Sequence, residues 1–243
     1  MSNWKLPPSD LALSDDAVHV WRAGVQLPTT RLDALSALLS ADEHQRAQRF
    51  KFAQHRDHFI AARGILRTVL GHYLKTPPET LHFVYGEHGK PALQGAEHLH
   101  FNLSHCRDQA LYAIAQNRRL GIDIEYARRP VNDEELAERF FAKMEVAALK
   151  EVPKARRPEA FFNCWTRKEA YLKARGEGIT VSLDSFAVSL KPDVAAALLH
   201  CDRFPAEVCR WTLHSFPPQP DYIAALCTEG KPTVHYWQWP DSD

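Results

Sequence analysis

Residues 121–125 read Gly121-Ile122-Asp123-Ile124-Glu125, an alternation of apolar and acidic side chains. In an extended strand, successive side chains face opposite sides, so the isoleucines turn towards a core and the acids share the other face. Two carboxylates on one face repel each other unless a cation lies between them. The stretch therefore predicts a strand with a buried apolar face and suggests a metal site on its acidic face.

A second informative stretch is Trp165-Thr166-Arg167-Lys168-Glu169-Ala170-Tyr171-Leu172-Lys173. On a helical wheel, Lys168 falls within an apolar stripe, and Glu169 and Lys173 lie at its edge. These three side chains are expected to line the boundary between core and water, where a cleft opens. The opposite side of the helix, with Asn163, Arg167 and Ala170, is expected to face solvent. A third acid with lysines beside it suggests a hard-metal site for a phosphate-bearing ligand.

Each of these features also has a simpler interpretation. A Glu–Lys pair four residues apart is usually a surface pair that contributes about 0.2–0.5 kcal/mol. Asp123 and Glu125 alone would fit the solvated face of an edge strand. His105, beside another predicted strand, is more often a structural residue than a ligand. The functional interpretation depends on the features occurring together.

Composition indicates an ordinary globular protein. The chain has 243 residues with 45% apolar and 25% charged residues and a formal net charge of zero, so bulk charge favours neither nucleic acid nor an acidic membrane. Seven Lys or Arg and one acid lie between Arg46 and Lys75, whereas acids outnumber bases from Asp123 to Glu151. Five cysteines without a CxxC spacing and the lack of an apolar leader or membrane segment predict a cytoplasmic protein with free thiols.

The order of predicted elements indicates an α+β fold made of two similar halves, residues 1–118 and 119–243. Each half is predicted as a strand, two helices and then antiparallel strands, with a ligand cleft between the halves. In the second half the strand 120–125 precedes helices over about 133–151 and 158–174. Further strands are predicted at 186–190, 211–216, 222–227 and 234–239. Ser40 and Glu43 form a capping-box pattern at the start of a helix in the first half.

Both stretches, at this spacing, resemble the signature of the 4′-phosphopantetheinyl transferases, specifically the long, surfactin-synthetase-activating (Sfp-like) type. The resemblance rests on residues 120–125 and on residues 161–178, which end in Gly176-Glu177-Gly178. It extends to Gly89-Lys90-Pro91, to Phe101-Asn102-Leu103-Ser104-His105 and to residues 139–145. It covers most of the chain, from about residue 41 to residue 227.

The resemblance implies a pseudo-twofold duplication of two α+β halves that bind coenzyme A between them with Mg²⁺, with Mn²⁺ as the alternative ion. It places Asp123, Glu125 and Glu169 at the metal-ligand positions and Lys168 and Lys173 near the pyrophosphate. Lys90, Ser104 and His105 match residues that hold the 3′-phosphate and the adenine ribose. Two arginines are candidates for further phosphate contacts, namely Arg46 and Arg63.

The reaction that the resemblance implies is transfer of 4′-phosphopantetheine from coenzyme A to a serine of an apo acyl, peptidyl or aryl carrier protein, with release of 3′,5′-ADP. Asp123, Glu169 and Lys173 are the expected catalytic residues: Lys173 stabilises developing charge and Glu169 is a candidate general base. The family also implies a monomer and a carrier-docking surface near residues 131–144. The carrier could belong to fatty acid, polyketide or nonribosomal peptide synthesis, or to lysine biosynthesis.

Two alternative functions remain open at this point. A Mg²⁺-dependent phosphodiesterase or nuclease would also use an acidic cluster and a basic patch, but aromatic residues are not interleaved with the patch. A non-catalytic module that binds coenzyme A or a carrier protein would be expected to lose an acid or a lysine, and none is missing.

Overall fold

The computed structural model describes residues 4–129, 132–176 and 181–240. Two sheets dominate the fold, one of four strands in the order β11-β1-β5-β4 and one of three in the order β6-β10-β9. Their strands are β1 Ala17–Gly24, β4 Leu99–Cys106, β5 Gln109–Gln116, β6 Leu120–Tyr126, β9 Trp211–Phe216, β10 Tyr222–Glu229 and β11 Thr233–Gln238. Two small hairpins accompany them, β2 Phe83–Tyr85 with β3 Pro91–Leu93 and β7 Phe186–Val188 with β8 Leu198–Cys201.

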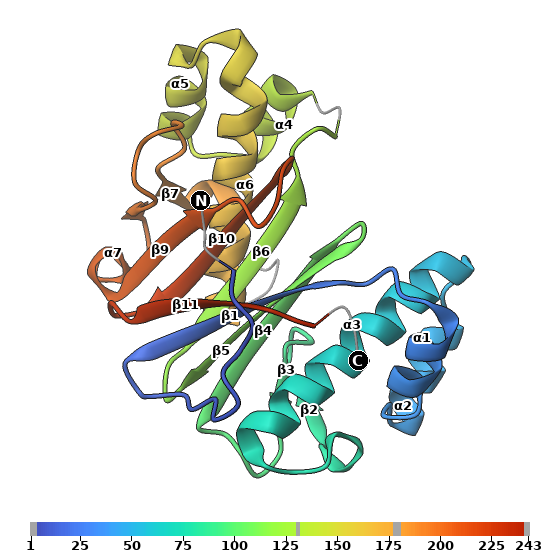
Figure 1. The fold of residues 1–243 in the computed structure, drawn as a ribbon. Coiled ribbons are helices and arrows are strands. Elements are labelled where there is room, and N and C mark those ends of the chain that lie inside the picture. Colours follow the sequence, from blue (N-terminus) through green and yellow to red (C-terminus); the bar gives the residue numbers. More distant parts are fainter. Residues whose placement is uncertain (1–3, 130–131, 177–180, 241–243) are drawn as a thin grey trace.

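The helices cover the outer faces of the two sheets, α3 on the first and α6 on the second (Figure 1). The helices are α1 Thr29–Ser36, α2 Ala41–Gln48, α3 Ala53–Leu74, α4 Asp133–Phe140, α5 Lys143–Glu151, α6 Arg157–Arg175 and the short α7 Glu207–Arg210. None of the helices in the described ranges has the length and apolar composition needed to cross a bilayer.

The inner faces of the two sheets pack against each other. Val18 and Val20 of β1 and Leu111 of β5 meet Ile122 and Ile124 of β6 in one buried cluster. The architecture is therefore four layers, helix–sheet–sheet–helix, and the predicted α+β class is confirmed. A twofold relation between the halves stays a prediction, since one sheet has four strands and the other three.

The last strand belongs to the first sheet. β11 pairs in parallel with β1, from Ala17 opposite Thr233 to Arg22 opposite Gln238. The strand was predicted at about the right residues, but its prediction among the antiparallel strands of the second half is wrong, because alternation of side chains does not encode a pairing partner.

The region predicted as one helix over 133–151 is two helices, α4 and α5. The chain is extended at Phe141 and Ala142, so that Phe141 turns into the core and stacks on Phe161. The carboxylate of Glu145 accepts the Ala142 N–H at 2.8 Å, which starts the second helix. Each half therefore has three helices of eight or more residues in its described part, rather than the two expected.

The Ser40 cap of α2 agrees with its prediction. The Ser40 N–H donates to Glu43 Oε2 at 2.9 Å, the reciprocal half of a capping box. The same carboxylate is buried and binds the guanidinium groups of Arg63 and Arg67 on α3. The cap thus also ties α2 to the long helix of the first half.

Candidate functional site

Strand β6 presents its acids as the alternation predicts. Ile122 and Ile124 are buried between the sheets, whereas Gly121, Asp123 and Glu125 are on the opposite face, where α6 packs. β6 is an edge strand of its sheet, and β10, the central strand, pairs with it along its whole length and holds it in place. The carboxyl groups therefore project from a fixed backbone.

Helix α6 lies directly on the backbone of β6 because Gly121 has no side chain. A Cβ atom at Gly121 would lie 2.2 Å from the Ala170 carbonyl oxygen and 2.3 Å from the Ala174 nitrogen. No real side chain fits at those distances, so only glycine permits this approach. The contact brings the face of α6 that carries Glu169 and Lys173 against the acidic face of β6.

At the centre of the site, Lys173 and Ser104 both bind Asp123. The Lys173 ammonium donates to Asp123 Oδ1 at 2.6 Å and to Ser104 Oγ at 3.0 Å. Ser104 Oγ, on β4 of the other sheet, donates to the same Asp123 oxygen at 2.9 Å. The second carboxylate oxygen of Asp123, Oδ2, is buried and has no hydrogen-bond partner. A buried anionic oxygen without a partner is costly, and a cation there would remove that cost.

The other two acids are electrostatically coupled to Asp123. Burial, and then the negative charge of Asp123, raises the pKa of both Glu125 and Glu169. Glu125 also accepts a weak hydrogen bond from the Cys106 thiol and lies 3.8 Å from the guanidinium of Arg129. Carboxyl groups that repel one another in this way are of the ligand type that a hard cation prefers.

The side chains of Asp123, Glu125 and Glu169 do not form a complete cation-binding site in this arrangement. Among the described residues, no three acidic, histidine or cysteine side chains are close enough together to ligate one ion. The Lys173 ammonium lies on Asp123 Oδ1, where it neutralises part of the charge. The residue types and the free Asp123 Oδ2 fit a divalent ion, and a bound ion would have to share Asp123 with Lys173 or displace it.

A cavity of about 270 Å³ opens beside these groups, between the two halves. The first half contributes residues 88–91 of the β2–β3 turn and Asn102 of β4, and the second half contributes Glu169, Leu172, Lys173 and Gly176 of α6 and its end. Asn102 also accepts the Ile122 N–H at 2.8 Å, which fixes β4 to β6. This role of Asn102 could not be predicted, since one asparagine in a sequence gives no indication of a contact between sheets.

Lys168 does not line this cavity, and the prediction that it lies at the boundary with water is wrong. Its side chain is fully buried on the other side of α6. The ammonium pairs with Glu145 at 2.8 Å and donates to the carbonyl oxygens of Leu183 at 2.7 Å and Phe186 at 2.6 Å. Lys168 thus joins α6 to α5 and β7.

The predicted solvent face of α6 is also buried. Asn163, Arg167 and Ala170 are 8%, 3% and 0% exposed. Arg167 donates to Ser215 Oγ at 2.8 Å and to the Ser189 carbonyl oxygen at 2.6 Å. The prediction that this face meets solvent is wrong, because residues of β9 and the segment after β7 cover it.

The predicted phosphate-binding residues of the first half divide into two groups. Arg46 is exposed and, with Arg49, Tyr85 and His88, lines a surface cavity of about 720 Å³ beside the β2–β3 turn. His105 is exposed and lines another, of about 740 Å³, together with His55 and His58. These two side chains are open to a ligand.

Arg63 and Lys90 are instead bound to protein groups. The guanidinium of Arg63 is buried against Glu43 and Tyr85. The Lys90 ammonium donates to the carbonyl oxygens of Leu120 at 2.9 Å and Lys173 at 2.7 Å. Burial, with the nearby charge of Arg119, lowers the Lys90 pKa to about 8.

Two predicted features lie partly outside the described residues. In the proposed docking region 131–144, Val131 is not described, whereas Met144 at its other end is 49% exposed. In the glycine pair that follows α6, Gly178 is not described, whereas Gly176 ends the helix with a φ of +74°.

Comparisons with known proteins agree with the motifs. The family model described as 4′-phosphopantetheinyl transferase superfamily matches residues 119–227, and the one for the 4′-phosphopantetheinyl transferase N-terminal region matches residues 27–117. The chain is 42% identical to 4′-phosphopantetheinyl transferase HetI of Nostoc over 93% of this chain and 94% of that protein. It is 30% identical to a putative 4′-phosphopantetheinyl transferase of Synechocystis, over 88% and 93% of the two chains.

A more distant relative is the Sfp protein itself. The chain is 26% identical to 4′-phosphopantetheinyl transferase Sfp of Bacillus subtilis, over 79% of this chain and 82% of that protein. The similarity thus covers both halves, including the strand with Asp123 and the helix with Glu169. The chain belongs to the 4′-phosphopantetheinyl transferase superfamily and is of the Sfp-like type.

Proposed function

We propose that this protein transfers the 4′-phosphopantetheine group of coenzyme A to a serine hydroxyl of an apo carrier protein and releases 3′,5′-ADP. The names of its relatives support the reaction class. The structural observation that carries the proposal is the placement of Lys173: its ammonium binds Asp123 at 2.6 Å and lines the cavity between the halves together with Glu169. A phosphoanhydride in that cavity would meet a cation and a general base at one place.

The proposed ion is Mg²⁺, or Mn²⁺, held by Asp123, Glu125 and Glu169. Carboxylate oxygens are the ligands that these hard ions prefer. When bound, the ion would neutralise charge on the diphosphate of coenzyme A. The free Oδ2 of Asp123 and the raised pKa values of the two glutamates support this assignment.

The chain's own residues would hold the substrate and move one proton. A new bond forms between the serine oxygen and the phosphorus that bears pantetheine, and the bond from that phosphorus to the bridging oxygen of 3′,5′-ADP breaks. Glu169, which lines the cavity, takes the serine proton. Lys173, whose side chain is 29% exposed, would compensate the charge that develops on the leaving phosphate.

Binding of coenzyme A would use the side chains that remain accessible. Arg46 and His105 keep their proposed contacts with the phosphates or the ribose. Ser104 is buried and bonded to Asp123 and Lys173, so a contact with the nucleotide would require its hydroxyl group to give up one of these bonds. Lys90, Arg63 and Lys168 are already bonded to protein groups, so the proposal does not assign phosphates to them. The carrier would dock near Met144, and we propose a monomer that acts in the cytoplasm.

Transfer can be tested with purified protein, coenzyme A, Mg²⁺ and apo acyl, peptidyl and aryl carrier domains. Intact-mass measurement should show the gain of one phosphopantetheine on the acceptor. The gain should be absent with chelator, with an acceptor whose serine is alanine, and with Asp123→Asn. Absence of any gain with every carrier would refute the proposal, and hydrolysis of nucleic acid in the same buffer would favour the phosphodiesterase alternative.

A further inference from the structure

The C-terminal end of α6 is held by side chains of other elements. The last carbonyl groups of a helix lack partners within it and carry partial negative charge. Here the Leu172 carbonyl accepts the Gly176 N–H at 2.9 Å. The Lys173 carbonyl accepts the Lys90 ammonium, and the Arg175 carbonyl accepts the guanidinium of Arg119. Two cations from outside the helix therefore complete its end.

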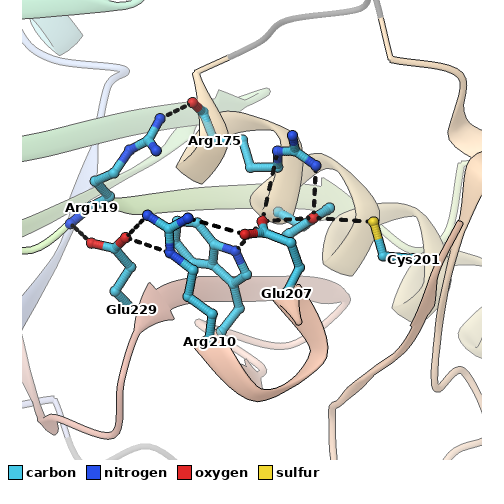
Figure 2. Close-up of polar contacts among 8 residues, drawn as sticks. Arg119, Arg175, Cys201, Glu207, Arg210 and Glu229 are labelled. Atoms are coloured by element: carbon cyan, nitrogen blue, oxygen red, sulfur yellow. Dashed lines mark hydrogen bonds and ion pairs between the residues drawn. The ribbon is translucent and has the colours of Figure 1, made fainter. Parts of the chain in front are cut away.

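Arg119 lies in the turn between β5 and β6, and Figure 2 shows its guanidinium bonded to the Arg175 carbonyl. Its own N–H donates to the Glu229 carboxylate at 3.0 Å, and Glu229 also binds Arg210. Arg119 is thus held by β10 and belongs to the same half as α6. It fixes the helix within that half but does not connect it to the other.

Lys90 is one of the side chains that connect the halves, with Asn102 and Ser104 of β4. It lies at the end of the β2–β3 turn in the first half, and its stem passes over Gly176, where a Cβ would lie 3.7 Å from Lys90 Cδ. Its ammonium donates to two main-chain carbonyls of the second half, Lys173 on α6 and Leu120 at the start of β6. One side chain thus joins the helix that carries Glu169 to the strand that carries Asp123.

These contacts are expected to be strong. A cation at a helix C-terminus is stabilised by the helix dipole, and hydrogen bonds to a charged donor are worth more than neutral ones. Removing the Lys90 ammonium would leave the Lys173 and Leu120 carbonyl oxygens with one hydrogen bond fewer. Because little water reaches this place, the lost bonds would be only partly replaced. The last turn of α6 would then be free to open.

We propose that Lys90 is a positioning residue that fixes the end of α6 and the start of β6 in the arrangement in which Glu169 and Lys173 meet Asp123. It acts through those residues and not by contact with the nucleotide. The kinetic part of this inference rests on the proposed transfer reaction, whereas the structural part does not.

The structural part can be tested by hydrogen–deuterium exchange on the ligand-free protein. Lys90→Met keeps most of the stem and removes the ammonium, so amides in residues 168–176 and 119–123 should exchange roughly tenfold or more faster. Exchange in α3 should stay unchanged. Lys191→Met is the matched control, because Lys191 loses only an exposed ion pair with Glu151. Lys90→Arg, which keeps charge and donors, should restore at least part of the protection.

The kinetic part separates positioning from phosphate binding. Loss of a positioning residue should lower kcat at least tenfold while the Kd for 3′,5′-ADP changes less than threefold. Loss of a phosphate ligand would instead weaken 3′,5′-ADP binding and leave the exchange pattern unchanged, which would overturn the inference. Unchanged exchange in a folded Lys90→Met protein would overturn it as well. If the wild type transfers nothing, the proposed function fails, and the exchange data still decide the role of Lys90.

Discussion

Replacing Gly121 by alanine should separate the two elements that form the site. The added methyl group would lie 2.2 Å from the Ala170 oxygen and 2.3 Å from the Ala174 nitrogen, both backbone atoms of α6. A helix backbone cannot rotate aside as a side chain can. The helix must therefore move back by about 1 Å to reach an ordinary contact distance.

The size of the effect follows from that displacement. Forced overpacking costs about 1–3 kcal/mol of stability, which for a chain of this length is roughly 2–12 °C in Tm. The displacement also lengthens the 2.6 Å contact between Lys173 and Asp123. A shift of about 1 Å in reacting groups typically lowers the rate about a hundredfold. Gly121→Ala should thus lose far more activity than its stability loss explains.

The assay is transfer to an apo carrier at a temperature well below Tm, with the folded fraction checked by circular dichroism. Gly24→Ala is the matched control, since Gly24 is also in a strand and a Cβ there would have nothing within 4 Å. The control should keep both Tm and kcat. A folded Gly121→Ala protein with wild-type kcat would refute the argument that this close approach sets the geometry of the site.

Three further predictions concern other parts of the molecule. Lys168→Met should lower the free energy of unfolding by about 3–5 kcal/mol in denaturant titration, because Glu145 would stay buried without its partner. Lys168→Met combined with Glu145→Leu should recover part of the loss. Full stability of the single variant would contradict the pairing. Burial lowers the pKa of His19 to about 4, so between pH 6.5 and 4 the unfolded chain binds a proton that the folded chain does not, and this residue alone should lower stability by about 3 kcal/mol as the pH drops through that range. His19→Gln should remove this share of the pH dependence and leave the share of the other buried histidines, and an unaltered pH profile would exclude His19 as a source. If Arg46 binds the 3′-phosphate, Arg46→Ala should raise KM for coenzyme A about tenfold with kcat nearly unchanged. The variant should have no effect with dephospho-coenzyme A, which lacks that phosphate. Equal losses with both substrates would show that Arg46 does not bind it.

Much of the fold could be predicted because apolar and polar side chains alternate along its strands and because capping residues, glycine and proline mark the ends of its helices. β6 was predicted within one residue of its end, and α6 within one residue at each end. β8 and α7 were missed because they have only four residues each, too few to show a period. The break between α4 and α5 was missed because no glycine or proline marks it, and a buried phenylalanine causes it instead.

The site could be predicted where a residue's role depends on its own strand or helix. Asp123, Glu125, Glu169 and Lys173 are brought to one region because strand alternation and helix periodicity determine where they point. The surroundings of Lys168 and Lys90 could not be predicted in this way, because their partners come from elements far along the chain. Periodicity shows that a lysine is in an unusual place, but it does not show which carbonyl or carboxylate lies opposite.

The parallel pairing of β11 with β1 has a consequence for how the protein forms during synthesis. Partners on these strands, such as Arg22 and Gln238, are 216 positions apart, and the whole second sheet lies between them in the sequence. While the ribosome is still producing β6, β9 and β10, β1 has one unpaired edge that could associate with other nascent chains. Aggregation should therefore be most pronounced for chains that stall or are cut just before residue 233, and a synthetic peptide covering β11 should rescue them.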